Sequence, residues 1–186
     1  RTIYKNRYRK MDHQTLVTDY FSTSWKPKPL SAHKFSGLAI LSKIKSTDKV
    51  IDIGCGANQF KPYITDLIGI DPANSNADLK LTLEDFSKIN KEKFSVAICF
   101  GSINFGTEDN ITNQISLITE LLTINGKIFW RFNPGLYDHG NDDFKNVNLY
   151  AWTEDKAKFF ANKFNFQIDE LVYESPNRIY SEWTKK

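Results

Sequence analysis

The sequence VIDIGCGAN at residues 50–58 joins a short apolar run to a glycine-rich turn. The run Val50–Ile53 is rich in β-branched residues and includes one acidic residue, Asp52, which predicts a buried strand. Gly54 and Gly56 permit a tight turn and let the backbone approach a ligand closely, because glycine has no side chain to obstruct it. The stretch therefore predicts a strand that leads directly into a ligand-binding turn.

A second apolar run ends in another carboxylate about fifteen residues later. The sequence LIGI at residues 67–70 is followed by Asp71. Ligands of α/β proteins bind outside the carboxyl ends of the strands, so Asp71 is expected near the glycine turn. A carboxylate in this place can accept hydrogen bonds from both hydroxyls of a ribose. Together the two runs predict a nucleoside-containing ligand.

The turn does not match a dinucleotide fingerprint, which requires a third glycine. Gln59 occupies that position, and Pro62 interrupts the following segment. The pattern D-x-G-x-G-x-N at residues 52–58 instead resembles motif I of the class I S-adenosylmethionine-dependent methyltransferases, and GID at residues 69–71 resembles the end of their second strand. The resemblance implies S-adenosyl-L-methionine as the cofactor and methyl transfer as the activity.

The resemblance covers roughly residues 46–135 and, more loosely, 150–184. It implies an α/β fold: a Rossmann-like, doubly wound, mostly parallel seven-stranded sheet with a C-terminal antiparallel hairpin. The pattern predicts strands at about 49–53, 67–70, 78–82, 94–100, 127–132, 166–173 and 178–184, and helices within 11–25 and at about 31–45, 109–122 and 153–164. Two short connections, before and after the second strand, depart from the family pattern because neither has room for an ordinary crossover helix.

The same resemblance implies which residues meet the cofactor. Asp52 and the glycine turn would meet its methionine part, and Asp71 would hold the ribose. Thr82 stands where the family usually has an acidic residue near the adenine, so the contact is expected from a neighbour in the sequence. The expected cofactor-binding set is Asp52, Gly54, Cys55, Gly56, Asn58, Asp71, Pro72, Leu83, Glu84 and Phe100.

Four residues are candidates for contact with the methyl acceptor. Ser102 and Asn104 follow the strand predicted at 94–100, and Arg131 and His139 lie in or beyond the strand predicted at 127–132. Arg131 could pair with an anionic substrate, and His139 could take a proton from a nucleophile. Methyl transfer can proceed by alignment alone, so no catalytic base is assigned. Neither an N-P-P-Y-like motif nor a Pro-Cys loop follows the strand at 94–100.

The N-terminal residues differ in charge from the rest. Residues 1–34 hold eight Lys or Arg residues against two Asp residues, a net charge of +6, so the remaining residues carry −3 of the total of +3. We expect residues 1–34 to be a basic and aromatic arm, packed as a lid, and residues 35–186 to be the methyltransferase domain. Arg and Lys interleaved with aromatic residues could also meet nucleic acid.

The composition argues against membrane-spanning, disulfide-rich and metal-binding proteins. No apolar run approaches the ~18 residues that a membrane span requires. Two cysteines do not make a disulfide framework, which favours a cytoplasmic protein, and no Cys/His spacing suggests a metal site. We expect methyl transfer to an acceptor that the sequence does not identify, and we favour a small molecule. A nucleic-acid methyltransferase that uses the arm, and an inactive cofactor-binding or interaction module, remain as alternatives.

Overall fold

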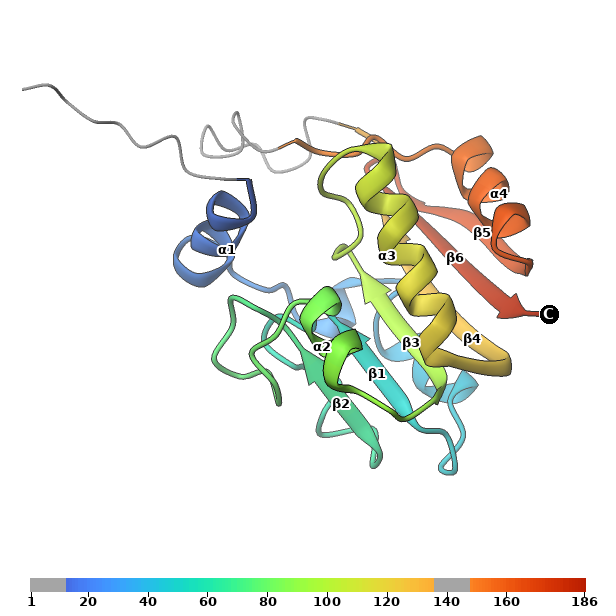
Figure 1. The fold of residues 1–186 in the computed structure, drawn as a ribbon, viewed down its shortest axis with the longest axis horizontal. Helices are drawn as coiled ribbons and strands as arrows, with labels where there is room; N and C mark the ends of the chain where they lie inside the picture. Colours follow the sequence, from blue (N-terminus) through green and yellow to red (C-terminus); the bar gives the residue numbers. More distant parts are fainter. Residues whose placement is uncertain (1–12, 136–147) are drawn as a thin grey trace, which may run out of the picture.

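The computed structural model describes residues 13–135 and 148–186. Within these ranges, six strands form one sheet in the order β2-β1-β3-β4-β6-β5 (Figure 1). The strands are β1 (Val50–Ile53), β2 (Leu67–Ile70), β3 (Phe94–Phe100), β4 (Leu122–Phe132), β5 (Phe166–Ser175) and β6 (Arg178–Lys185). The helices are α1 (His13–Thr23), α2 (Leu83–Ile89), α3 (Glu108–Leu121) and α4 (Glu154–Lys163), with two short 3₁₀ helices, η1 (Leu30–Ala32) and η2 (Leu38–Lys43).

The strand directions confirm the predicted fold class. Strands β1 to β4 are parallel to one another, and β6 runs antiparallel to both β4 and β5. The predicted C-terminal hairpin is therefore present, and β3 has the bounds expected from the sequence. Helices α3 and α4 each begin and end within one residue of the expected bounds.

The seventh strand, predicted at 78–82, is wrong. Only an isolated parallel bridge joins Leu79 to Ile70 beside β2. The connection after β2 is too short for a crossover, and side chains there take backbone donors that a strand would need. The Asp78 carboxylate accepts a hydrogen bond from Gly69 N at 2.8 Å, so the edge of β2 is partly satisfied by a side chain. The sheet consequently has six strands instead of seven.

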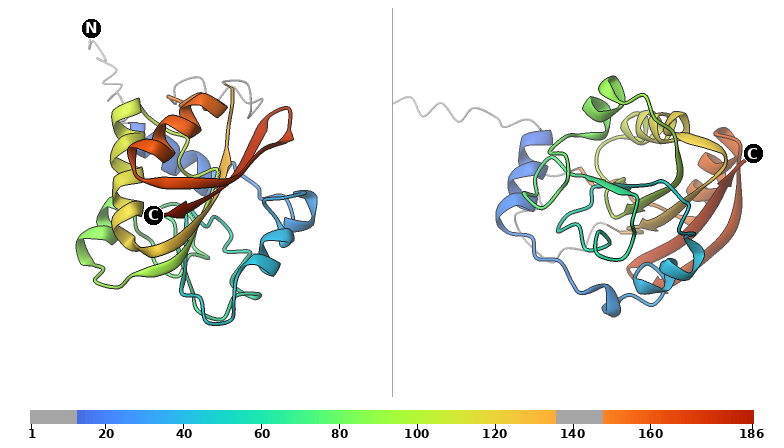
Figure 2. Two further views of the ribbon diagram at one scale, coloured as in Figure 1. Left: turned by 90° about the vertical axis from the view of Figure 1, so that its right-hand side faces the viewer. Right: turned by 90° about the horizontal axis from the view of Figure 1, so that it is seen from below.

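Two hydrophobic layers cover the sheet, and β4 supplies both of them. Ile128 and Trp130 of β4 pack with helices α3 and α4, whereas Phe129 packs on the opposite face with Ile40 and Phe60. Successive strand residues point to opposite faces, which explains this alternation. Figure 2 shows α3 and α4 on one side of the sheet and the segment containing η1 and η2 on the other.

The helix predicted at 31–45 is also wrong, because this segment forms η1 and η2 joined by a tight bend. A Cβ atom at Gly37 would lie 2.0 Å from the carbonyl oxygen of Leu30, so the backbone passes too close for another residue. The Glu174 carboxylate of β5 accepts hydrogen bonds from Phe35 N at 2.6 Å and Ser36 N at 2.7 Å. A partner distant in sequence therefore takes backbone donors that a helix would have used.

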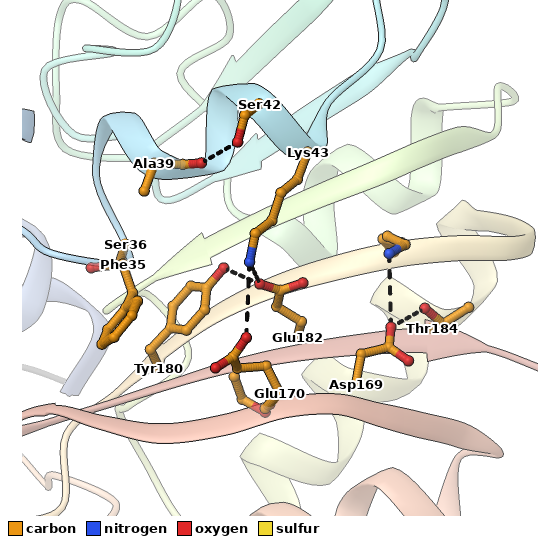
Figure 3. Close-up of polar contacts among 12 residues, drawn as sticks. Phe35, Ser36, Ala39, Ser42, Lys43, Asp169, Glu170, Tyr180, Glu182 and Thr184 are labelled. Atoms are coloured by element: carbon orange, nitrogen blue, oxygen red, sulfur yellow. Dashed lines mark hydrogen bonds and ion pairs between the residues drawn. The ribbon is translucent and has the colours of Figure 1, made fainter.

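A polar cluster fastens η2 to the sheet (Figure 3). Lys43 donates a hydrogen bond to Glu182 of β6, and the Tyr180 hydroxyl donates to the same carboxylate oxygen at 2.7 Å. Glu182 is buried, and the ammonium and hydroxyl donors compensate for its lost hydration. Burial, and then the bond to Glu182, raise the pKa of Tyr180 far above its ordinary value, so Tyr180 stays protonated and keeps donating.

Across residues 13–135 and 148–186, no helix is both long enough and apolar enough to cross a membrane.

Candidate functional site

A cavity of about 680 Å³ opens at the carboxyl ends of the parallel strands. Its wall includes Gly54 after β1, Asp71 after β2, Gly101 after β3 and Arg131 near the end of β4. Helix α1 and the residue Trp25 close another side, and Figure 1 shows α1 lying toward the arrowhead end of the sheet. This is the position at which parallel α/β sheets bind ligands, and the volume suits a small organic molecule.

The structure brings together most of the residues singled out in the sequence. Those that line the cavity are Gly54, Gly56, Asp71, Pro72, Leu83, Glu84, Phe100, Ser102 and Arg131. Asp52, Cys55, Asn58 and Asn104 are not part of its wall. His139 lies outside the described residues.

The glycine turn has the conformation that its sequence predicts. Gly54 and Gly56 have φ angles of 68° and 53°, in the left-handed region that side chains disfavour. A Cβ atom at Gly54 would lie 2.4 Å from Ser102 Cβ, and one at Gly56 would lie 2.7 Å from the Trp25 ring. Ser102 and Trp25 therefore lie directly against the backbone of the turn. Gly54 and Gly56 also line the cavity, where a ligand can approach the same backbone.

Asp71 is held in a fixed orientation by backbone donors. Its Oδ1 accepts hydrogen bonds from Ala73 N at 2.8 Å and Asn74 N at 2.9 Å, and its Oδ2 accepts one from Gly56 N at 3.0 Å. A carboxylate has about four lone-pair positions. Oδ2 therefore keeps about one position for a ligand hydroxyl, where the sequence suggested bonds to both hydroxyls of a ribose.

Asp52 lies behind the turn, with 4% of its surface exposed. Burial, and then the negative charge of Asp71, raise its pKa to about 8, although Arg131 acts in the opposite direction. The Asp52 carboxyl is therefore largely protonated at neutral pH.

Two of the predicted residues make hydrogen bonds within the protein. Asn58 donates a hydrogen bond to the carbonyl oxygen of Asn76 at 3.1 Å and so supports the turn after β2. Asn104 is completely buried, and its Oδ1 accepts a hydrogen bond from Asn133 N at 3.1 Å. The neighbouring thiol of Cys55 is kept protonated, since burial and then Asp52 raise its pKa above the ordinary value.

Buried polar atoms of the wall that have no hydrogen-bond partner within the described part of the chain include three on the side chains of Ser102, Gln114 and Asn133. The three atoms are Ser102 Oγ, Gln114 Oε1 and Asn133 Oδ1. Unpartnered buried polar atoms are rare and costly, and two of these three are pure acceptors. The cavity is therefore suited to a polar ligand that brings N–H or O–H donors.

Several lining residues were missed by sequence reasoning. They are Gln14, Val17, Thr18 and Phe21 of α1, Phe105, Asn110 and Gln114 around α3, and Asn133, Asn148 and Arg178 near the ends of β4 and β6. Gln114 also donates a hydrogen bond to Glu84 at 3.4 Å, so α3 and α2 jointly shape the wall. A glutamine on a helix or an arginine beside a hairpin has no motif, and only the packing of elements reveals such residues.

The ionisable residues of the wall are separated by charge. Asp71 and Glu84 lie at the β2 and α2 end, whereas Arg131 and Arg178 lie at the β4 and β6 end. Arg131 donates to Ser36 Oγ at 3.4 Å and lies with its guanidinium carbon 5.7 Å from the centre of the Phe100 ring. Among residues 13–135 and 148–186, no group of three His, Cys, Asp or Glu side chains is placed to hold a metal ion.

Solved structures with this fold are S-adenosylmethionine-dependent methyltransferases. Magnesium protoporphyrin IX methyltransferase from Synechocystis PCC 6803 with bound S-adenosylhomocysteine has a TM-score of 0.70 at 14% identity, over 94% of this chain and 100% of that chain. The 1,6-didemethyltoxoflavin-N1-methyltransferase of Burkholderia thailandensis has a TM-score of 0.69 at 12% identity, over 93% and 88% of the two chains. The N-methyltransferase NodS of Bradyrhizobium japonicum has a TM-score of 0.66 at 14% identity, over 93% and 97%. The chain therefore has the class I methyltransferase fold.

Comparison of the amino-acid sequence with those of known proteins does not identify a family. No protein-family model matches the chain. A phosphoribosylaminoimidazole-succinocarboxamide synthase from Schizosaccharomyces pombe is 28% identical over 119 residues, which are 64% of this chain and 39% of the synthase. The chain thus spans about two fifths of that relative's length, and the likeness does not establish a family.

Proposed function

We propose that the chain binds S-adenosyl-L-methionine in the cavity and transfers its methyl group to a small-molecule acceptor. The observation that carries this proposal is the set of polar groups around the glycine turn. Asp71 keeps an acceptor position beside Gly56, and unpartnered acceptor atoms of Gln114 and Asn133 lie in the same wall. A nucleoside with hydroxyl and amino donors satisfies such groups.

The residues present fit this cofactor. Asp71 would accept from a ribose hydroxyl, Pro72 and Leu83 would flank the adenine, and Gln114 with Glu84 would face its polar edge. When bound, the cofactor supplies a methyl group on a positively charged sulfur. Ser102 and Arg131, at the ends of β3 and β4, would then orient the acceptor in line with that group, and the aromatic rings of Phe21 and Trp25 would exclude water.

The ligands bound in the solved structures support the same proposal. The Synechocystis, Burkholderia and Bradyrhizobium methyltransferases contain S-adenosylmethionine or S-adenosylhomocysteine, and the Burkholderia enzyme also contains bound 1,6-didemethyltoxoflavin. An inactive cofactor-binding module is the second candidate, favoured by the short connections on either side of β2. A panel of acceptors tested for turnover separates the enzyme from the module.

Ligand choice tests the cofactor assignment directly. We expect isothermal titration to show binding of S-adenosylmethionine and S-adenosylhomocysteine, and binding of NAD and NADP that is at least ten-fold weaker. The reason is that Gln59 stands where a dinucleotide site needs its third glycine. Equal or tighter binding of either dinucleotide would overturn the assignment.

A further inference from the structure

The basic end of the cavity is built from two neighbouring strands. Arg131 of β4 pairs with Tyr180 of β6 in the antiparallel register, and Arg178 lies two residues before Tyr180. Side chains two residues apart on a strand share a face, so Arg131 and Arg178 are diagonal neighbours on one face. Both line the cavity, and no other lysine or arginine among the described residues does so.

The neighbourhood of Arg131 contains one carboxylate, Glu174, which is held mainly by other donors. That carboxylate receives hydrogen bonds from Phe35 N, Ser36 N and Ser36 Oγ, the last at 2.6 Å, so its lone pairs are directed to the 35–36 segment. Burial lowers the pKa of nearby His33, and Arg131 and Arg178 lower it further, while Glu174 only partly opposes them. Both guanidinium groups thus act as positive charges at this end, beside the single carboxylate of Glu174.

We propose that Arg131 and Arg178 bind the carboxylate or phosphate group of an anionic methyl acceptor, whose apolar part packs against Phe21 and Phe105. A guanidinium offers paired N–H donors that match the oxygen atoms of either group. Phe21 and Phe105 lie in the same cavity wall, with ring centres 5.6 Å apart. The role as an acceptor site rests on the proposed methyl transfer, whereas the anion site itself does not.

The arrangement separates the acceptor from the cofactor. Asp71 and Glu84 would repel an anion at the β2 and α2 end, where the nucleoside is expected, and the guanidinium groups attract it at the opposite end. Ser102 lies against Gly54 and therefore near the expected methyl group. An acceptor fixed by its anionic group at the far end would thus place its remaining atoms toward Ser102.

Binding of simple probes tests the anion site. The probes are benzoate and phenyl phosphate, with benzamide as the neutral analogue of benzoate, titrated by NMR against the protein with and without S-adenosylhomocysteine. We expect both anions to bind at least ten-fold more tightly than benzamide. Arg131→Gln and Arg178→Gln should each weaken benzoate binding at least five-fold, while Arg131→Lys should retain part of it because the charge remains. Lys158→Gln, on exposed helix α4, should leave it unchanged.

Three outcomes overturn the proposal. The first is that benzamide binds as tightly as benzoate. The second is that Arg131→Gln and Arg178→Gln bind benzoate as tightly as the unchanged protein does. The third outcome concerns the cofactor, whose own carboxylate could occupy Arg131. If Arg131→Gln weakens S-adenosylhomocysteine but neither benzoate nor methylthioadenosine, which lacks that carboxylate, then the arginine serves the cofactor. Failure of S-adenosylhomocysteine to bind would instead refute the proposed function, and the benzoate titration of the unliganded protein would still decide the anion site.

Discussion

The Asp71 carboxylate, which is proposed to bind the ribose, also accepts hydrogen bonds that stabilise the surrounding loop. Three backbone N–H groups donate to it, from Gly56, Ala73 and Asn74. We expect Asp71→Ala to lower the free energy of unfolding by about 2 kcal/mol or more, since hydrogen bonds to charged groups contribute ~1.5–3 kcal/mol each and the donors would lose their partner. Urea denaturation measures this change.

The isosteric variant separates ribose binding from stabilisation of the loop. Asp71→Asn keeps an oxygen that can accept from Ala73 N and Asn74 N, while its amide group faces the Gly56 donor. It should therefore cost about half as much stability as Asp71→Ala and still weaken S-adenosylhomocysteine at least ten-fold. Unchanged affinity in the folded Asn variant would remove Asp71 from the proposed binding site.

Asp52 predicts how stability changes with pH. Its pKa is about 8 in the folded protein against an ordinary 3.8, chiefly because it is buried. Between these values the folded protein holds a proton that the unfolded chain has lost, so this group makes stability fall as the pH rises, by up to about 1.4 kcal/mol per pH unit. The loss is complete once the pH exceeds the folded value.

Asp52→Asn removes this proton and is the matched variant. The difference in unfolding free energy between Asp52→Asn and the unchanged protein should grow in favour of the variant from pH 5 to pH 8 and then level off. Urea denaturation at pH 5, 6, 7, 8 and 9 gives both curves. Parallel curves would show that Asp52 is already ionised in the folded protein at pH 5.

At the scale of elements, helix α1 is held to the rest of the cavity wall by only a small hydrophobic cluster. Its residues Val17 and Phe21 pack in a small cluster around Leu149 and Phe105, separate from the two main hydrophobic clusters. We expect Phe21→Ala to speed hydrogen exchange of the α1 amides, to leave exchange in β3 unchanged, and to weaken S-adenosylhomocysteine about ten-fold. Local opening is expected where few buried apolar contacts hold an element.

A second aromatic residue provides the control for this experiment. Phe159 lies on α4 with 52% of its surface exposed and is not part of the cavity wall. Phe159→Ala should change neither exchange in α1 nor ligand affinity. If Phe21→Ala instead accelerates exchange in β3 as much as in α1, then α1 is integral to the core, and its interpretation as a lid fails.

The elements also show what a sequence pattern can predict. Apolar runs and capped helices were found correctly, as with β3 and with α3, where Thr107 accepts a hydrogen bond from Asn110 N. The helix at 31–45 was predicted wrongly because Glu174 of β5 takes the backbone donors of Phe35 and Ser36. The strand at 78–82 was predicted wrongly because the Asp78 side chain takes Gly69 N, a donor at the edge of β2. Such long-range hydrogen bonds leave no periodic signal in the sequence.

Some residues of the candidate site were predictable from the sequence, and others were not. Gly54, Gly56 and Asp71 lie at strand ends, where a local motif fixes their place, and the structure puts all three in the cavity wall. Gln114 and Arg178 reach the same wall from a helix and a hairpin, so only the assembled sheet brings them near the turn. Asn104 has a suitable position in the sequence, yet its side chain is buried against Asn133.

At the scale of the whole molecule, charge distribution bears on the class of acceptor. Residues 1–34 carry a net charge of +6, and the rest of the chain carries −3. A nucleic-acid acceptor would have to be drawn chiefly by the arm, because the remaining residues carry a net negative charge and the cavity wall holds two arginines against two carboxylates. A cavity of about 680 Å³ suits a small molecule without help from an arm.

Salt dependence decides between the two classes. We expect filter binding of a 20-nucleotide RNA and a matching DNA duplex to give dissociation constants of roughly 10⁻⁵ M or weaker at physiological salt, as for non-specific contacts. Replacing Arg7, Arg9 and Lys10 together by glutamine should lower the salt slope and leave S-adenosylhomocysteine affinity unchanged, since the proposed cofactor contacts come from Asp71, Glu84 and Gln114. The opposite result is tight RNA or DNA binding that weakens steeply between about 50 and about 200 mM salt and disappears in the triple variant. That result would make nucleic acid the acceptor.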